Sequence, residues 1–99
     1  MEVNMTRNDK ELIAAVEGRL DTMTSPELED KLMPVLAETE KLVFDLEKLE
    51  YVSSAGLRVL MATFKVMKGK GGSMVIRNVT PKVKEVFMVT GLINGFDFE

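Results

Sequence analysis

Residues 49–58 constrain the fold more than any other part of this chain, because a strand pattern there gives way to a helix pattern. Upstream, the short apolar run at residues 41–46 is typical of a buried strand. Downstream, apolar side chains recur at helical spacing, at Leu57, Leu60, Met61, Phe64 and Met67. Ser53 and Ser54 stand at the junction, where hydroxyls can accept hydrogen bonds from the free N–H groups of the first helical turn. The same N–H groups and the helix dipole favour a phosphate, so a serine here is a cap or a phosphorylation site.

Composition indicates one small domain and excludes several kinds of chemistry. The 99 residues, of which 45% are apolar, suffice for a single domain over residues 1–99 with one core. Cysteine and histidine are both absent, which excludes disulfides, thiolate metal sites and a histidine base. There is no apolar run of about 18 residues and no signal-peptide pattern. We therefore expect a cytoplasmic protein without a membrane partner.

Charge is distributed unevenly along the chain, whose net charge is −3. Residues 1–50 carry a balance of −7, residues 51–84 a balance of +7, and the remainder −3. The basic segment can attract an acidic partner or a phosphate, or it can be a plain solvated helix face. Nucleic acid is not expected as a partner, because the whole chain is acidic and no aromatic residues alternate with the basic ones.

The patterns along the chain predict the element order β-β-α-β-α-β-α. Strands are expected at residues 2–6, 11–18, 41–46 and 73–77, with a short edge strand within 92–98, and helices at about 25–39, 55–68 and 81–90. Thr24 and Glu27 have the spacing of a capping box, and Pro34 predicts a kink or an early end of the first helix. This order indicates an α/β fold: a mixed sheet of four to five strands, with helices packed against it and right-handed crossovers between parallel strands.

Two motifs resemble the STAS domain family, as found in bacterial anti-sigma factor antagonists. One comprises residues 18–21 and 24–28 (GRLD and TSPEL), and the other comprises residues 44–46, 49 and 51–57 (FDL, L and YVSSAGL). Both occur at the right separation, and the resemblance covers essentially the whole chain. It implies a mixed sheet whose helices mostly cover one face, with a phosphorylatable serine at the start of the second helix. That serine falls on Ser54; Ser53, where the family commonly has aspartate, is a rival acceptor.

The resemblance also implies partners. They are a serine kinase with a histidine-kinase-like ATPase fold, which also binds a sigma factor, and a serine phosphatase. Unphosphorylated antagonist binds the kinase and frees the sigma factor, and phosphorylated antagonist dissociates from the kinase. The expected partner-binding residues are Asp21, Met23, Thr24, Ser53, Ser54, Gly56 and Leu57.

Each of these residues also has a plain structural interpretation. Ser53, Ser54 and Thr24 can be helix caps, Asp21 a turn residue, and Gly56 a site of close packing. Met23 is expected in an exposed loop, where a flexible thioether suits a binding surface.

The sequence argues against an enzyme. A serine nucleophile needs a base, and there is no histidine, no Gly-x-Ser-x-Gly and no phosphate-binding nucleotide motif. No catalytic residue, cofactor or metal is therefore expected. Two alternatives to the phosphorylation switch stay open: an adaptor subunit of a transport or signalling complex that is never phosphorylated, and a sensor that binds an anion or small molecule at the second helix.

Overall fold

A long two-stranded hairpin begins the chain and organises the sheet. The computed structural model describes residues 1–99. Its elements are β1 (Glu2–Asn8), β2 (Glu11–Leu20), α1 (Ser25–Leu36), β3 (Lys41–Asp45), β4 (Leu49–Val52), α2 (Ser54–Gly69), β5 (Ser73–Arg77), α3 (Pro81–Thr90), the short 3-10 helix η1 (Leu92–Asn94) and β6 (Asp97–Phe98). β1 and β2 are antiparallel, and every other strand pair is parallel. The mixed α/β fold is thus confirmed, including the short edge strand at the end of the chain.

The sheet has six strands, one more than the upper limit expected, because residues 49–52 form β4. β2 is ten residues long, and besides β1 it pairs with two parallel strands, each along a different part of its length. β3 pairs with its first half, at residues 11–15, and β4 pairs with its end, at residues 18–20. The register shifts at Gly18, whose φ of 88° is accessible to glycine without strain. The remaining order is β1-β2-β3-β5-β6.

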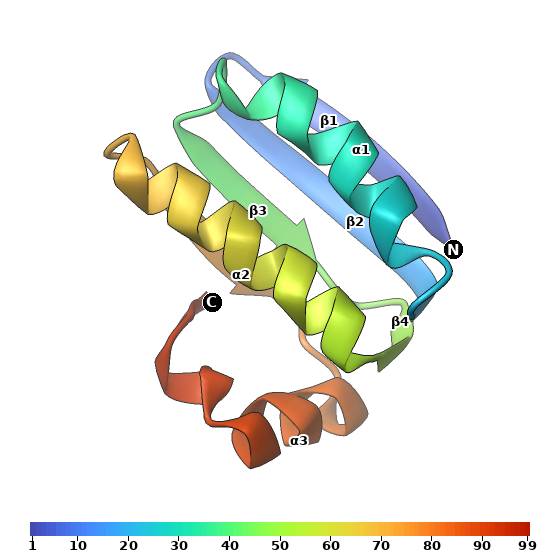
Figure 1. Ribbon diagram of the computed structural model, residues 1–99. Coiled ribbons are helices and arrows are strands. Elements are labelled where there is room, and N and C mark those ends of the chain that lie inside the picture. The colour runs from blue at the N-terminus through green and yellow to red at the C-terminus, as the bar shows by residue number, and fades with distance from the viewer.

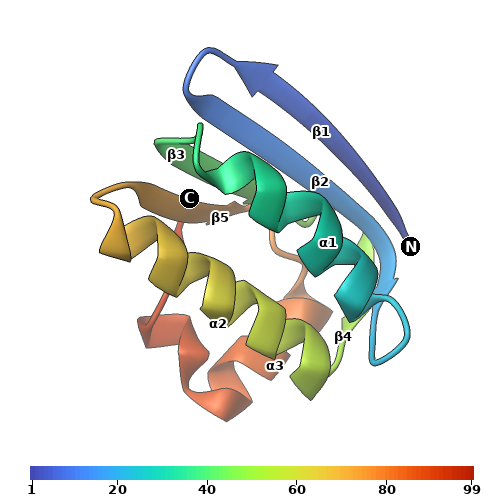
Figure 2. The ribbon, with the colours of Figure 1, turned by 45° about the horizontal axis from the view of Figure 1, so that its top comes forward.

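Helices α1 and α2 lie side by side across one face of the sheet, and α3 packs beside β4 and η1 (Figures 1 and 2). The core lies between these layers and includes Leu20, Leu28, Phe44, Leu60 and Phe87. The helices therefore cover mainly one face, as expected. None of them combines the length and the apolar character that crossing a membrane would require.

The first helix ends earlier than residue 39. It continues past Pro34 by two residues and stops at Leu36. Two cations bind carbonyl groups of the last turn and of the residues that follow. Arg7 donates to the Val35 and Glu38 carbonyls, both at 3.2 Å. Lys70 Nζ donates to the carbonyls of Ala37 at 2.9 Å and Thr39 at 2.8 Å. Favourable interactions of cations with the free carbonyls at a helix end explain this arrangement.

Candidate functional site

Ser53 joins β4 to α2. Its N–H donates to the Leu20 carbonyl at 2.9 Å, which ties the start of α2 to the end of β2. Its backbone is extended, and its Oγ accepts the Gly56 N–H at 3.2 Å. The role of Ser53 as a helix cap is thereby confirmed.

Ser54 is the first residue of α2 and is exposed. Its hydroxyl makes no hydrogen bond within the domain, so the alternative that Ser54 is the cap is wrong: Ser53 already occupies that position. The first turn of α2 contains no acidic residue. The helix dipole at this end therefore favours an added negative charge on Ser54, with no carboxylate of the same turn to oppose it.

The loop between β2 and α1 folds around Asp21. Its Oδ1 accepts the N–H groups of Met23 at 3.0 Å and Thr24 at 3.1 Å. The Thr24 backbone N–H is the main cause that lowers the pKa of the Asp21 carboxyl, and the Met23 N–H, the Thr24 hydroxyl and Arg19 act in the same direction. Asp21 therefore shapes this turn, which is one of the two roles expected of it.

Thr24 does not complete a capping box, and that prediction is wrong. It stands at the N-cap position of α1 but makes no side-chain capping bond. Its hydroxyl instead donates to the Arg19 carbonyl at 2.9 Å and accepts the Asp21 N–H at 2.8 Å. The side chain thus closes the loop back onto the end of β2. Ser25, by contrast, is buried and donates to the Asp21 carbonyl.

The structure divides the other expected residues between surface and interior. Met23 is 83% exposed at the loop, as predicted. Gly56 is buried, and a Cβ there would lie 2.8 Å from Leu20 Cγ and 2.9 Å from both the Leu20 carbonyl and Val52 Cγ2. Close packing is therefore the role of Gly56 that the structure supports. Leu57 is 6% exposed, so these two residues support the surface mainly from beneath.

Sequence reasoning missed Arg58, where two shallow grooves meet. One groove runs between α1 and α2 and includes Glu29, Ala55 and Arg58 in its lining. The other runs between α2 and the end of α3, where Ser54, Arg58 and Thr90 contribute to the lining. The spacing of four residues between Ser54 and Arg58 was the signal that could have identified it, because such residues are neighbours on a helix.

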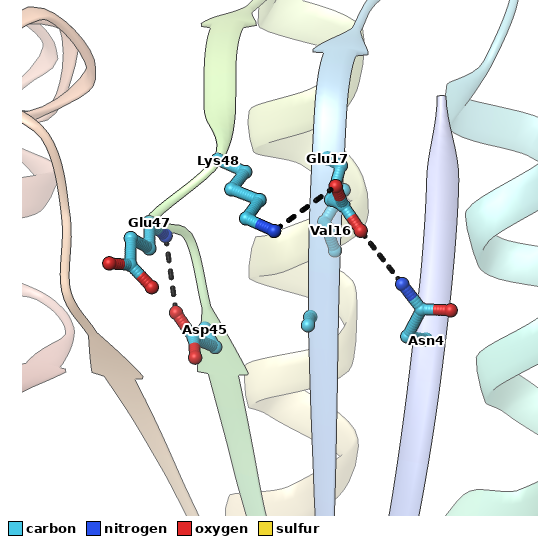
Figure 3. A pocket seen from close by; sticks show the side chains of 7 residues that line it. Asn4, Val16, Glu17, Asp45, Glu47 and Lys48 are labelled. Carbon is cyan, nitrogen blue, oxygen red and sulfur yellow. Dashed lines mark hydrogen bonds and ion pairs between the residues drawn. The ribbon is translucent and has the colours of Figure 1, made fainter.

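A third depression lies on the sheet face that the helices leave uncovered (Figure 3). There Glu17 accepts from Asn4 Nδ2 at 2.8 Å and lies 4.0 Å from Lys48 Nζ. Asp45 accepts the Glu47 N–H at 3.1 Å. These contacts join β1, β2 and the loop after β3, and no group of three or more His, Cys, Asp or Glu residues is arranged to hold a metal ion. The depression is therefore part of the sheet's own polar surface.

Comparison with known proteins agrees with the fold and shows the family. The model of the family described as "STAS domain" matches residues 2–99. The chain is 30% identical over 97 residues to the anti-sigma-B factor antagonist of Bacillus subtilis (strain 168), covering 98% of this chain and 89% of that protein. An anti-sigma factor antagonist from Mycobacterium paratuberculosis has a similar structure, with a TM-score of 0.88 and 28% identity, covering 98% of this chain and 83% of that one.

The same fold occurs in SpoIIAA, an anti-sigma factor antagonist. Its unphosphorylated form matches with a TM-score of 0.87 and 16% identity, covering 99% of this chain and 88% of that one. Its phosphorylated form matches with a TM-score of 0.79 and 15% identity, covering 99% and 91%. At these identities the likeness concerns the fold alone.

Proposed function

This chain belongs to the STAS domain family, and we propose that it is an anti-sigma factor antagonist switched by phosphorylation of Ser54. In the unphosphorylated state it binds a serine kinase with a histidine-kinase-like ATPase fold, so that the kinase releases its sigma factor. Phosphorylation of Ser54 ends the complex, and a serine phosphatase restores the binding form. The protein acts in the cytoplasm through binding and carries no catalytic site of its own.

The exposure of Ser54 is the observation that carries this proposal. Its hydroxyl is free, whereas the neighbouring hydroxyl of Ser53 is engaged in the cap. A kinase can therefore modify Ser54 without breaking a hydrogen bond of the fold. This difference favours Ser54 over Ser53 as the acceptor.

A phosphate at this position would change the surface and not the fold. Phosphoserine carries roughly −1.5 to −2 charges at pH 7, and the start of a helix tolerates negative charge. A partner packed over the same position would have to take that charge out of water, which costs several kcal/mol that an ion pair repays only where its geometry is excellent. Phosphorylation then weakens the complex while the domain stays folded.

The Asp21 loop supplies the second part of the proposed contact surface. Met23 offers an exposed, adaptable apolar side chain, and Asp21 a charged one, beside the start of α2. Because hydrogen bonds to Asp21 already order the loop, binding costs little additional conformational entropy. Thr24 and Ser53 hold this edge in place, and Gly56 and Leu57 lie under it.

Capture from a lysate of the native host tests the proposal. The wild-type chain, Ser54→Ala and Ser54→Asp are immobilised, and retained proteins are identified by mass spectrometry. We expect wild type and Ser54→Ala to retain a serine kinase that Ser54→Asp does not. The purified kinase with ATP should then place phosphate on Ser54, and calorimetry should give a Kd for Ser54→Asp at least about tenfold higher than that of wild type.

Two results would contradict the proposal. Phosphate found only on Ser53 or on a threonine would remove Ser54 as the acceptor. Equal affinity of Ser54→Asp and wild type for the captured partner would indicate an adaptor that is not controlled at this position. The melting temperature of Ser54→Asp serves as the folding control, because a carboxylate is acceptable at a helix start.

A further inference from the structure

We propose that Arg58 positions the phosphate of phosphorylated Ser54 by forming an ion pair with it within the domain. This inference rests on the proposed function and assigns a residue to the phosphorylated state. Arg58 is a positioning residue here: it acts on the phosphate after transfer and takes no part in the transfer itself.

The first argument is geometric. Ser54 and Arg58 are four residues apart on α2, a spacing that places two side chains on the same helix face one turn apart. Both are exposed, and both line the groove between α2 and the end of α3. A guanidinium on a long side chain can therefore reach a phosphate on Ser54 without a change of backbone.

The second argument is that Arg58 is uncommitted. Its side chain takes part in none of the ion pairs or side-chain hydrogen bonds of the domain, whereas Arg7, Arg19 and Arg77 each have a partner. Formation of the new pair therefore breaks no existing interaction. A guanidinium also presents two parallel N–H groups that match the oxygen spacing of a phosphate.

The surrounding charges favour this pairing. Helix α2 contains no acidic residue along its whole length. Glu29 of α1 lines the other groove together with Arg58, but the two side chains form no ion pair within 4.0 Å. Asp21, in the loop before α1, is already paired with Arg19 at 3.9 Å.

On the α3 side, the groove between α2 and α3 is lined by Thr90 and Leu92, which carry no charge. A dianionic phosphate attracts Arg58 more strongly than a single distant carboxylate does.

This pairing would decide where the phosphate charge is held. The phosphate would be drawn along α2 toward the groove that Leu57 and Met61 also line. A partner approaching this edge would then meet a fixed charge over a partly apolar groove, and not a freely rotating side chain.

The test uses the full chain with phosphoserine installed at position 54 during synthesis, so no kinase is needed. Phosphorus NMR follows the titration of the phosphate in the wild type, Arg58→Gln and Arg58→Lys. We expect Arg58→Gln to raise the titration midpoint by about half a pH unit, the size typical of an exposed pair, because a cation favours the dianion. Arg58→Lys keeps a positive charge at position 58, so its midpoint should lie close to the lower value of the wild type.

Lys65→Gln is the matched control, since it removes one positive charge from the same helix about two turns beyond Arg58. Its midpoint should equal that of the wild type. A midpoint in Arg58→Gln equal to that of the wild type would overturn the proposal, because the helix start alone would then account for the titration. The proposal would also be overturned if Lys65→Gln shifted the titration midpoint as much as Arg58→Gln does. Neither result bears on whether a kinase modifies Ser54, so failure here and failure of the proposed function are distinguishable.

Discussion

The Ser53 N–H lies 2.9 Å from the Leu20 carbonyl oxygen, and this hydrogen bond joins the end of β4 to the end of β2. Asp21 and Ser54 are the residues immediately beyond it. They therefore emerge from the same edge of the sheet although they are far apart in sequence. Side chains that follow neighbouring parallel strands often form binding sites in this way.

Replacing Ser53 should cost stability, whereas replacing Ser54 should not. Ser53→Ala removes the oxygen that accepts the Gly56 N–H, a loss of about 1 kcal/mol. Ser54→Ala removes an exposed hydroxyl without a partner, so the change should stay within about 0.5 kcal/mol. Urea unfolding of the two variants checks this. A larger loss in Ser54→Ala than in Ser53→Ala would contradict the assignment of the cap.

Gly56→Ala should destabilise the domain by about 2 kcal/mol or more, since the new Cβ would overlap Leu20 and Val52. The Leu20 carbonyl is backbone and cannot move aside as a flexible side chain could. Gly69→Ala is the control at the other end of α2, where a Cβ meets nothing within 4 Å. It should be neutral or stabilising by up to about 1 kcal/mol. Thermal unfolding distinguishes the two, and equal melting temperatures would show that Gly56 is not required for packing.

Asp21→Ala should make the melting temperature of the domain depend less on pH in the acid range. The hydrogen bonds from the loop hold the pKa of Asp21 below its ordinary value of 3.8 in the folded state. The stabilising contribution is therefore complete above that value and is lost as pH falls through the lower, folded-state pKa. Melting temperatures of wild type and Asp21→Ala should differ at neutral pH and converge in acid.

Asp30→Ala is the control for the loss of an aspartate, because Asp30 is an exposed residue of α1 in none of the hydrogen bonds or ion pairs. Its melting temperature at neutral pH should stay close to that of the wild type. A difference between wild type and Asp21→Ala that stays constant from about pH 7 to about pH 2.5 would show that the carboxylate charge does not stabilise the loop.

Lys70→Met should weaken the contact between the ends of α1 and α2. Lys70 Nζ donates to the carbonyl of Leu36, at the end of α1, and to those of Ala37 and Thr39 just beyond it, and methionine cannot. We expect a loss of about 1 to 3 kcal/mol in the free energy of unfolding, typical of hydrogen bonds from a charged group. Lys65→Met, at an exposed position of the same helix, should change it by less than about 0.5 kcal/mol. Similar losses in both variants would indicate a general effect of charge.

Local patterns identified the elements that carry strong periodicity. The apolar spacing of α2 and the buried run of β3 were readable because each element's own residues express its repeat. β4 was missed because its burial pattern, with Glu50 and Tyr51 both exposed, neither alternates nor forms an apolar run. It is a strand only because the end of β2 offers it free hydrogen-bonding groups.

The motif around Ser53 and Ser54 located the candidate site but not the division of roles within it. Which of two adjacent serines caps a helix depends on backbone dihedrals, and both hydroxyls are chemically equal in the sequence. In the same way, Thr24 and Glu27 have the spacing of a capping box, yet the Thr24 hydroxyl donates to the Arg19 carbonyl and closes the loop after β2.

By itself, the sequence determined the α/β class, the order of the elements other than β4 and η1, and the junction at Ser53 and Ser54 where a helix begins. Periodicity, capping residues and turn residues act over a few positions, so they can be read along the chain. Only the tertiary structure decided that Gly56 packs against Leu20 and Val52, that Asp21 lies at the edge where Ser54 emerges, and that Arg58 has no partner. These features depend on contacts between segments distant in sequence, which form only when the sheet and its crossovers bring them together.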